Sequence, residues 1–305
     1  MGRVFFMQFI KIVLVGIGQI FLQKNGLSGL IICIAMFFSH WALGIGCLLG
    51  AIIGTLTAIK LNYPKEEIKQ GLYGFNASLA FMCTMFTFGL NGVSFLVFLL
   101  GVISAVVATL VMREFTKRNW VAYTFPFVFT CWIFCWGISQ IGLFGLWQTT
   151  PELVDHTATL ESIKQPFYAW AEVNFGRSLI TGILLFIAIA ISSPTVATWG
   201  MSATIISPTL AGFLFDIEPN QLANGIYSFS AILLACAFSG NRFRDLVYVI
   251  FGIMLAICIQ FGVEKIGLAP YTIGFIVTAW FVLWIKGKVD HSKVSSEKLS
   301  NLFNP

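Results

Sequence analysis

Charged residues are scarce in this sequence of 305 residues. Asp, Glu, Lys and Arg together make up 10% of the chain, whereas 58% of its residues are hydrophobic. A soluble globular domain has about 25% charged residues, so this composition excludes an ordinary soluble protein. The sequence therefore predicts an all-α polytopic membrane protein, whose apolar helices face lipid.

Catalytic and metal-binding motifs are also missing. The 3 histidines are far apart in the sequence, and no HExxH, GxSxG or phosphate-loop pattern occurs. The 7 cysteines lie inside apolar runs without a CxxC pair, which favours small apolar packing residues over ligands or disulfides. We therefore expect no enzyme activity, no metal site and no cofactor. The net charge of +5 is better explained by membrane topology than by nucleic-acid binding.

Long apolar runs fill most of the chain. A run of roughly 20 apolar residues is long enough to cross a membrane as a helix. We predict ten spans, five in each half, at residues 27–40, 41–60, 69–90, 93–112, 121–147, 180–193, 195–214, 222–240, 245–263 and 270–286. A segment that carries polar residues precedes each set of five.

These two preceding segments are 4–22, which includes Gln19, and 157–175, which includes Glu172. Neither suits a helix surrounded by lipid, so both are predicted to be re-entrant and covered by protein or by a water-filled cavity. The predicted division is a first repeat over 1–147, an extracytoplasmic linker over 148–166, a second repeat over 167–286 whose re-entrant segment begins near 157, and a cytoplasmic tail over 287–305.

One segment of the chain occurs twice. GLYGFNASL (71–79) returns as GIYSFSAIL (225–233), and the two agree at five of nine positions. Such a duplication predicts two copies of one structural unit. Because each copy has an odd number of spans, the second copy is inverted in the membrane relative to the first. Inverted repeats place a transport site near the midplane at their interface, which predicts a central pore.

The basic residues agree with this topology. The side of the membrane that holds the 60–68 loop receives Lys60, Lys65, Lys69, Arg113, Lys117, Arg118, Arg242, Arg244, Lys286, Lys288, Lys293 and Lys298. The opposite side receives Lys164, Arg177 and Lys265. By the positive-inside rule the first side is cytoplasmic. We therefore predict a multi-pass protein of the cell (inner or plasma) membrane with both termini in the cytoplasm.

Several residues recur at a nearly constant offset between the two copies. The pairs are Gln19 and Glu172, Phe75 and Phe229, Leu79 and Leu233, Thr124 and Thr272, and Ser28-Gly29 with Thr181-Gly182. Pairs of this kind are expected near a pseudo-two-fold axis or symmetrically about a pore. Ordinary packing also explains part of the pattern, because Gly and Ser permit close helix contacts and a single Phe is usually a core residue.

Glu172 has two interpretations. An ionisable residue beside a re-entrant turn is a functional candidate, because burying its charge without a partner is costly. In the other interpretation Glu172 is hydrated at the outer interface, near Arg177.

Three motifs then occur in a fixed order: GIGQIFLQKNGLSG (16–29), GLYGFNASL, and TFPFVFTCW (124–132). In order and spacing they resemble the urea transporter family, channels for urea found in bacteria and vertebrates, and specifically a bacterial-type member with a single pair of repeats. The resemblance covers nearly the whole chain. It implies two five-span halves that each contain a re-entrant helix, one pore in each protomer, and a homotrimer in the lipid bilayer.

The resemblance also implies a role for each paired residue in passive, channel-type transport of urea. A ladder of oxygen atoms that accept the N–H groups of urea would include Gln19, Glu172, Thr124 and Thr272. The walls and the constriction of a narrow slot would consist of Phe75, Phe229, Leu79, Leu233 and Phe175.

The sequence departs from the family pattern at several positions, which are Leu22, Gly26, Ser178, Leu179, Ser228, Ser230 and Gly274. These differences leave open a channel for other small neutral amides, water or ammonia. The further alternative is an ion-coupled secondary transporter with an inverted-repeat fold. That mechanism needs a coupling acid at the midplane, for which Glu172 is an isolated candidate.

Overall fold

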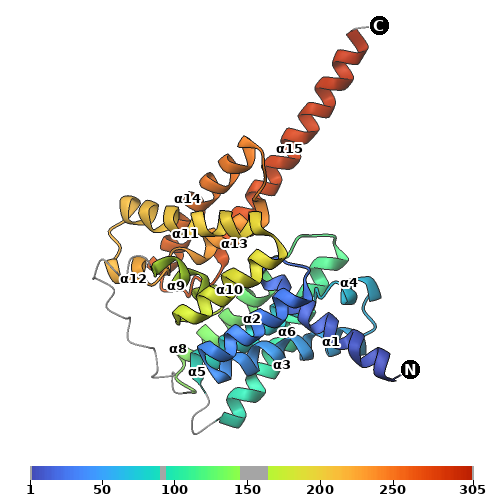
Figure 1. Ribbon diagram of the computed structural model, residues 1–305, viewed down its shortest axis with the longest axis vertical. Coiled ribbons are helices and arrows are strands. Elements are labelled where there is room, and N and C mark those ends of the chain that lie inside the picture. The colour runs from blue at the N-terminus through green and yellow to red at the C-terminus, as the bar shows by residue number, and fades with distance from the viewer. Residues whose placement is uncertain (1, 90–93, 145–163, 304–305) are drawn as a thin grey trace.

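The computed structural model describes residues 2–89, 94–144 and 164–303, and this part of the chain consists of helices and turns without a β-strand (Figure 1). The first half contains α1 (Gly2–Gly18), the 3-10 helix η1 (Gln19–Phe21), α2 (Gly26–Ser39), α3 (Trp41–Lys60), α4 (Lys65–Lys69), α5 (Phe75–Phe88), α6 (Ser94–Lys117), α7 (Phe125–Cys131), the π-helix η2 (Trp132–Gly137) and α8 (Ile138–Gln140). The second half contains α9 (Gln165–Glu172), α10 (Leu179–Ser192), α11 (Pro194–Leu214), α12 (Pro219–Ala223), α13 (Phe229–Phe238), α14 (Phe243–Lys265) and α15 (Ile273–Phe303). Of the predicted 148–166 linker, residues 148–163 lie outside the described residues, as does the start of the 157–175 segment.

Each of the ten predicted apolar runs contains a helix, but the helices differ in length. Three described helices, Trp41–Lys60, Phe95–Lys117 and Phe243–Lys265, are long and apolar enough to cross a membrane alone, and a bent pair of helices is a fourth candidate. Helix α13 has 10 residues, which is about 15 Å against a hydrocarbon layer of about 30 Å. The apolar helices support a membrane protein, whereas helix length alone does not establish the number of crossings.

The bent pair joins Phe6–Phe21 to Gly26–Ser39 at 76° and includes the predicted N-terminal re-entrant segment. The chain turns at Leu22, whose φ is 60°, and α2 then begins at its N-cap Asn25. The Oδ1 atom of Asn25 accepts hydrogen bonds from the backbone N–H groups of Leu27 and Ser28, at 2.9 and 3.3 Å. An N-cap of this kind satisfies N–H groups that have no partner inside the helix.

The second half begins with the same arrangement. Phe175, with a φ of 64°, turns the chain between α9 and α10. Ser178 is the N-cap of α10, and its Oγ accepts a hydrogen bond of 3.1 Å from the N–H of Thr181. Both predicted re-entrant segments therefore end in a left-handed turn that leads into a capped apolar helix.

The duplicated GLYGF and GIYSF segments form the turns that lead into the short helices α5 and α13. Their glycines have positive φ angles, 72° at Gly71 and 80° at Gly225, which glycine adopts readily. Both turns also lie against the first helix of their own half. A Cβ atom at Gly71 would lie 2.5 Å from the N atom of Gly16, and one at Gly225 would lie 2.4 Å from the Cα of Ala169. The repeated glycine is thus needed for both backbone conformation and space.

The two halves contact each other along α2 and α10 (Figure 1). The Ser28 hydroxyl on α2 donates to the carbonyl oxygen of Ala188 on α10, at 2.6 Å, and the Thr181 hydroxyl on α10 donates to the carbonyl oxygen of Ala35 on α2, at 3.3 Å. Donor and acceptor each lie 153 positions from their counterparts (181 − 28 and 188 − 35). The same bond is therefore made twice, with the halves exchanged.

A second exchanged pair of bonds involves two tryptophans. Trp132 Nε1 donates to the carbonyl oxygen of Ala269 at 2.8 Å, and Trp280 Nε1 donates to that of Val121 at 2.7 Å. These positions are also equivalent, because Trp280 follows Trp132 by 148 residues and Ala269 follows Val121 by 148.

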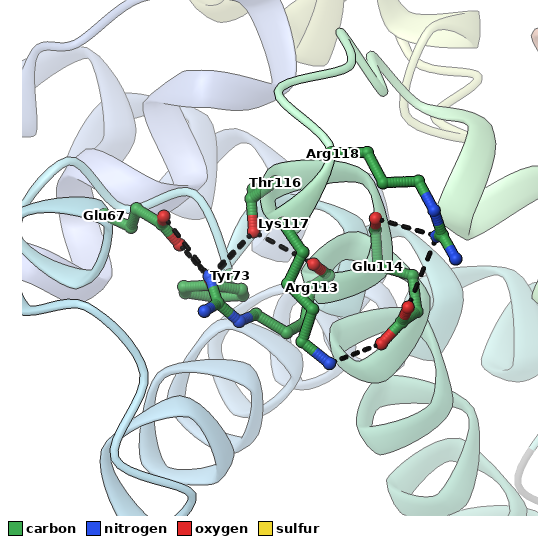
Figure 2. A network of polar contacts seen from close by, with 7 residues as sticks. All are labelled: Glu67, Tyr73, Arg113, Glu114, Thr116, Lys117 and Arg118. Atoms are coloured by element: carbon green, nitrogen blue, oxygen red, sulfur yellow. Dashed lines mark hydrogen bonds and ion pairs between the residues drawn. The ribbon is translucent and has the colours of Figure 1, made fainter.

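A polar network joins α4 to the C-terminal end of α6 (Figure 2). Arg113 Nη1 binds the Glu67 carboxylate at 3.0 and 3.3 Å and donates to Thr116 Oγ1 at 3.2 Å. The Tyr73 hydroxyl also donates to Glu67. Glu114 pairs with Lys117 and Arg118 on the exposed side of the same helix end. Basic residues predicted to share one side of the membrane therefore lie close together here.

The first part of α15 lies near the same end of α6. The rings of Phe115 and Trp280 stack with centroids 6.3 Å apart, and Lys286 lies over the rings of Phe238 and Tyr248 at 5.1 and 5.0 Å. Helix α15 then continues to Phe303 and projects away from the other helices (Figure 1). The polar segment after Lys286 extends this helix, and it contains no proline before Pro305 that would end it.

Candidate functional site

Two buried threonines, one from each half, meet where the halves join. Thr124 directly precedes α7 and Thr272 directly precedes α15, and each follows a tyrosine with positive φ. Their Oγ1 atoms share a hydrogen bond of 2.7 Å, and the residues are 2% and 5% exposed. Each hydroxyl is both donor and acceptor, so the pair keeps one proton and several lone pairs for another polar molecule.

The predicted slot residues lie at the starts of two short helices. Phe75 and Phe229 are the first residues of α5 and α13, and Leu79 and Leu233 follow one turn later on the same helix faces. Phe75 and both leucines are buried, while Phe229 is half-buried. In the part of the chain that the structure describes, neither Phe ring stacks on another aromatic ring.

Gln19 is buried at the start of η1, where its side chain is held in one orientation. Its Nε2 donates to the carbonyl oxygen of Gln70 at 2.8 Å, and Lys24 Nζ donates to the Oε1 of Gln70 at 3.1 Å. Because its amide nitrogen is used in this way, Gln19 offers its Oε1 as an acceptor.

Glu172 is the last residue of α9 and forms an ion pair with Arg177, with 3.5 Å between Oε1 and Nε. The two side chains are 16% and 26% exposed. The guanidinium of Arg177 also lies 5.3 Å above the ring of Phe86. The proximity of Glu172 to Arg177 agrees with the interpretation that Glu172 lies at the outer interface. The low exposure of the Glu172 side chain shows that it is partly buried there. Gln19 and Lys24 of the first half thus occupy the positions equivalent to the Glu172–Arg177 ion pair of the second half.

Phe175 belongs to an aromatic cluster. Its ring lies 5.2 Å from that of Phe86 and 6.0 Å from that of Phe127, and Phe127 lies 5.5 Å from Tyr271. Leu22 has the same left-handed conformation as Phe175 but no ring. The neighbouring Phe21 instead stacks on Trp170, with centroids 5.7 Å apart. The departure at Leu22 therefore removes an aromatic face from one half.

A second difference between the halves involves Asn76 and Ser230, which occupy equivalent places in the duplicated segment. Asn76 Nδ2 donates to the carbonyl oxygen of Tyr123 and its Oδ1 accepts from the N–H of Phe127, both at 3.1 Å. These bonds attach α5 to the start of α7. The Ser230 hydroxyl is buried and, within the described residues, has no hydrogen-bond partner.

One group of functional candidates is not predicted from the sequence, in which the cysteines have the pattern of separate packing residues. Cys83 of α5, Cys131 of α7 and Cys135 of η2 are all buried, and their Sγ atoms lie within 4.8 Å of one another. The spacing of four residues between Cys131 and Cys135 is a partial signal, because it places both thiols on one helix face. The contribution of Cys83 depends on how α5 packs against α7.

These features define an all-helical membrane protein with apolar helices and a polar centre where its halves meet. A family model described as "Urea transporter" matches residues 10–287. The chain belongs to the urea transporter family, which confirms the resemblance carried by its three motifs.

Curated relatives agree with this family. The chain is similar to urea transporter 1 of Rattus norvegicus, with 25% identity over an alignment of 256 positions that covers 79% of this chain and 65% of the relative. Urea transporter 1 of Mus musculus matches to the same extent. Urea transporter 1 of Ovis aries is 38% identical over 74 residues, 24% of this chain and 19% of the relative. The chain thus spans 65% of the length of the rat and mouse proteins.

Proposed function

We propose that this protein is a channel that conducts urea passively across the cell membrane, through a slot between two inverted repeats. The observation that carries the proposal is the buried hydroxyl pair of Thr124 and Thr272, where the two halves of a urea transporter family member meet. The similar rat, mouse and sheep proteins are all named urea transporters.

The exchanged hydrogen bonds support the proposed inverted repeats. Two units related by a two-fold axis contact each other through the same residues with partners exchanged, as the pairs on α2 and α10 and the two tryptophans do. We propose five spans and one re-entrant helix in each half. Transport proteins with this plan have their substrate site at the interface of the repeats.

The polar residues suit a solute such as urea, which is planar and neutral and carries four N–H bonds and one carbonyl. Removing its water without replacement costs about 2–7 kcal/mol for each polar group. Oxygen atoms along the path offset that cost. We assign this role to the Thr124 and Thr272 hydroxyls, the Gln19 Oε1 atom and the Glu172 carboxylate.

The apolar residues suit selection by shape and by charge. Phe75 and Phe229 supply aromatic faces at the starts of α5 and α13, and Leu79 and Leu233 narrow the path one turn further. A cation in such a slot would lose its hydration, and the Glu172 carboxylate, which is already paired with Arg177, would not replace it. Neutral molecules therefore pass and ions are excluded.

The two differences between the halves bear on selectivity. Leu22 in place of an aromatic ring makes the slot wider in the first half than beside Phe175. The unpartnered Ser230 hydroxyl offers an additional polar group in the second half. We therefore include small amides such as formamide and acetamide among the passengers to be tested, together with water and ammonia.

The cellular arrangement follows from the basic residues and from the family. Phe115 at the predicted cytoplasmic end of α6 stacks on Trp280 of α15, and the 215–224 segment of the opposite side contains no Lys or Arg. We propose a multi-pass protein of the cell membrane with cytoplasmic termini. A homotrimer is proposed from the family resemblance, and the mass of the purified protein in detergent tests it.

Reconstitution into liposomes tests the channel. After an osmotic jump with urea outside, protein-containing liposomes should reswell much faster than empty ones, without a proton or sodium gradient. Reswelling at the rate of empty liposomes contradicts a urea channel. Reswelling that requires an ion gradient supports an ion-coupled transporter instead.

Two variants test the oxygen ladder. Gln19→Ala removes an acceptor, and Glu172→Gln removes the charge while keeping the shape of the side chain. Each should slow urea influx several-fold. Lys117→Ala, at the exposed end of α6, is the control and should conduct as the unmodified protein does. The ladder assignment is wrong if both variants conduct normally.

A further inference from the structure

Three thiols lie together inside the first half of the protein. Cys83 and Cys131 are 0% exposed, as is Cys135, and their Sγ atoms lie within 4.8 Å of one another. They come from α5, the last residue of α7, and the π-helix η2. Short π-helical segments are often found at functional sites. In the described part of the chain this group of potential metal ligands includes no His, Asp or Glu.

The spacing suits three sulfur atoms around one metal ion. With metal–sulfur bonds of about 2.3 Å, as for zinc, a planar three-coordinate site has sulfur atoms about 4 Å apart. Because no two of the Sγ atoms are more than 4.8 Å apart, shifts of about 1 Å or less would bring them to that geometry.

Two threonine hydroxyls beside the thiols are poor candidates for a fourth ligand. Thr84 Oγ1 lies 3.7 Å from Cys135 Sγ, and Thr87 Oγ1 lies 4.0 Å from Cys83 Sγ. Both donate to backbone carbonyl oxygens of their own helix, those of Ala80 and Cys83, at 2.9 and 2.8 Å. A structural zinc ion takes four ligands, usually Cys or His. Three soft sulfur ligands instead suit a soft cation.

We propose that Cys83, Cys131 and Cys135 form a binding site for a soft monovalent cation of the Cu(I) type. On binding, the thiols that become ligands release their protons to solvent, because the thiolate is the ligating form. The equivalent positions of the second half are Ala237, Ala279 and Leu283, so the three thiols have no counterpart there.

The site continues the helix faces of the proposed slot. Cys83 follows Leu79 by four residues on α5, and Cys131 follows Thr124 by seven, spacings that place both thiols on those residues' helix faces. A bound cation with its three sulfurs would therefore lie one helical turn beyond the constriction. We expect it to slow the solute flux, an expectation that rests on the proposed channel function, whereas the binding site does not.

Binding is tested on the purified full-length protein in detergent. Cu(I), supplied without oxygen, competes with a coloured Cu(I) chelator. The protein and a control variant with Cys33, Cys47, Cys236 and Cys258 all changed to Ser should each bind one Cu(I). Cys131→Ser alone, and the triple variant of the three site cysteines, should bind at least ten-fold more weakly. Equal binding by the triple variant, or loss of binding by the control, overturns the site.

X-ray absorption of the copper-loaded protein gives a measurement that does not depend on variants. Three sulfur neighbours at one distance support the site, and two sulfurs in a linear arrangement overturn it. Zn(II) serves as the comparison cation. Zn(II) binding as tight as that of Cu(I) overturns the assignment to a soft cation.

Flux through liposomes then tests the position beside the slot. Cu(I) should slow urea influx several-fold in the unmodified protein and in the four-cysteine control, and should not affect the triple variant. Stoichiometric binding with unchanged influx overturns the position beside the slot. If the metal-free protein conducts no urea at all, the proposed function fails while the binding result stands.

Discussion

Thr124 and Thr272 depend on each other because both hydroxyls are nearly inaccessible to water. Removing one hydroxyl leaves the other buried without its partner, which costs more than the net value of the bond itself. The same hydroxyl pair therefore stabilises the contact between the two halves and supplies oxygen atoms to the proposed solute path.

Changing either threonine to valine, which keeps the branched shape, should destabilise the protein by about 1–3 kcal/mol. The double variant Thr124→Val with Thr272→Val should cost little more than one single change, because no hydroxyl is then left unpaired. Unfolding of the purified proteins in detergent measures these three values. A double variant whose cost equals the sum of the singles argues against the coupling.

Asn76 and Ser230 provide a matched comparison between the halves. Asn76→Ala removes two hydrogen bonds that attach α5 to the start of α7, so we expect a loss of about 2–3 kcal/mol of stability. Ser230→Ala removes a buried hydroxyl without a partner among the described residues and should be neutral or slightly stabilising. The same unfolding assay compares them, and equal destabilisation contradicts this account.

Some of these residue contacts follow from the sequence and others do not. The constant offset between the copies predicts that Thr124 and Thr272 are related, and they do meet. The contact of Glu172 with Arg177 joins residues five positions apart, and it belongs to the interfacial interpretation of Glu172. The thiol cluster joins residues about 50 positions apart, and such a contact depends on how helices pack, which apolar patterns leave undetermined.

Among the helices, the closest approaches occur at the turns that open each half. Gly29 of α2 lies against α1, and a Cβ atom there would be 1.8 Å from the carbonyl oxygen of Leu14. Gly182 of α10 lies against α9 in the same way, and a Cβ atom there would be 1.8 Å from the carbonyl oxygen of Phe167. Backbone atoms cannot move aside as a flexible side chain can, so both positions require glycine.

Gly29→Ala and Gly182→Ala should each prevent α1 from packing on α2, or α9 on α10, and strongly lower the yield of folded protein. Gly262→Ala is the control, because no atom lies within 4 Å of the added Cβ and alanine favours a helix over glycine by about 1 kcal/mol. Size-exclusion chromatography in detergent reports the folded fraction. Normal yields of both variants would show that these close contacts are dispensable.

The apolar runs locate the helices better than they locate the helix ends. The run at 222–240 contains α13, which spans only Phe229–Phe238, since Gly225 and the residues around it form a turn. A run of apolar residues indicates which part of the chain lies in an apolar environment. The start of the helix within that run is set by the glycine with a left-handed conformation. The same reason explains why α5 begins at Phe75 within the run at 69–90.

For the molecule as a whole, charge predicts orientation. The Arg113 network lies at the predicted cytoplasmic end of α6, and a cavity of about 330 Å³ on the predicted opposite side is lined by Asp216, Glu218, Glu264 and Lys265. Lys and Arg near the ends of the spans, rather than Asp and Glu, set the orientation of a membrane protein, so the side of the Arg113 network is predicted to be cytoplasmic.

Labelling of single cysteines from known sides of the membrane measures this orientation. In a Cys258→Ser background, which removes the exposed thiol among those described, Lys65→Cys should react with an impermeant maleimide only from the cytoplasmic side. Glu218→Cys, near the equivalent position of the second half, should react only from outside. Reaction of both variants from the same side rules out the inverted arrangement.

The exchanged bonds between α2 and α10 also bear on the origin of the fold. Bonds that recur with donor and acceptor exchanged are those that two identical chains form across the two-fold axis of a homodimer. A half-length ancestral chain could therefore have formed this contact with a second copy of itself before the two coding units were fused. In that history Asn76 and Ser230, once identical, diverged only after fusion, when a change in one half no longer had to be tolerated by the other.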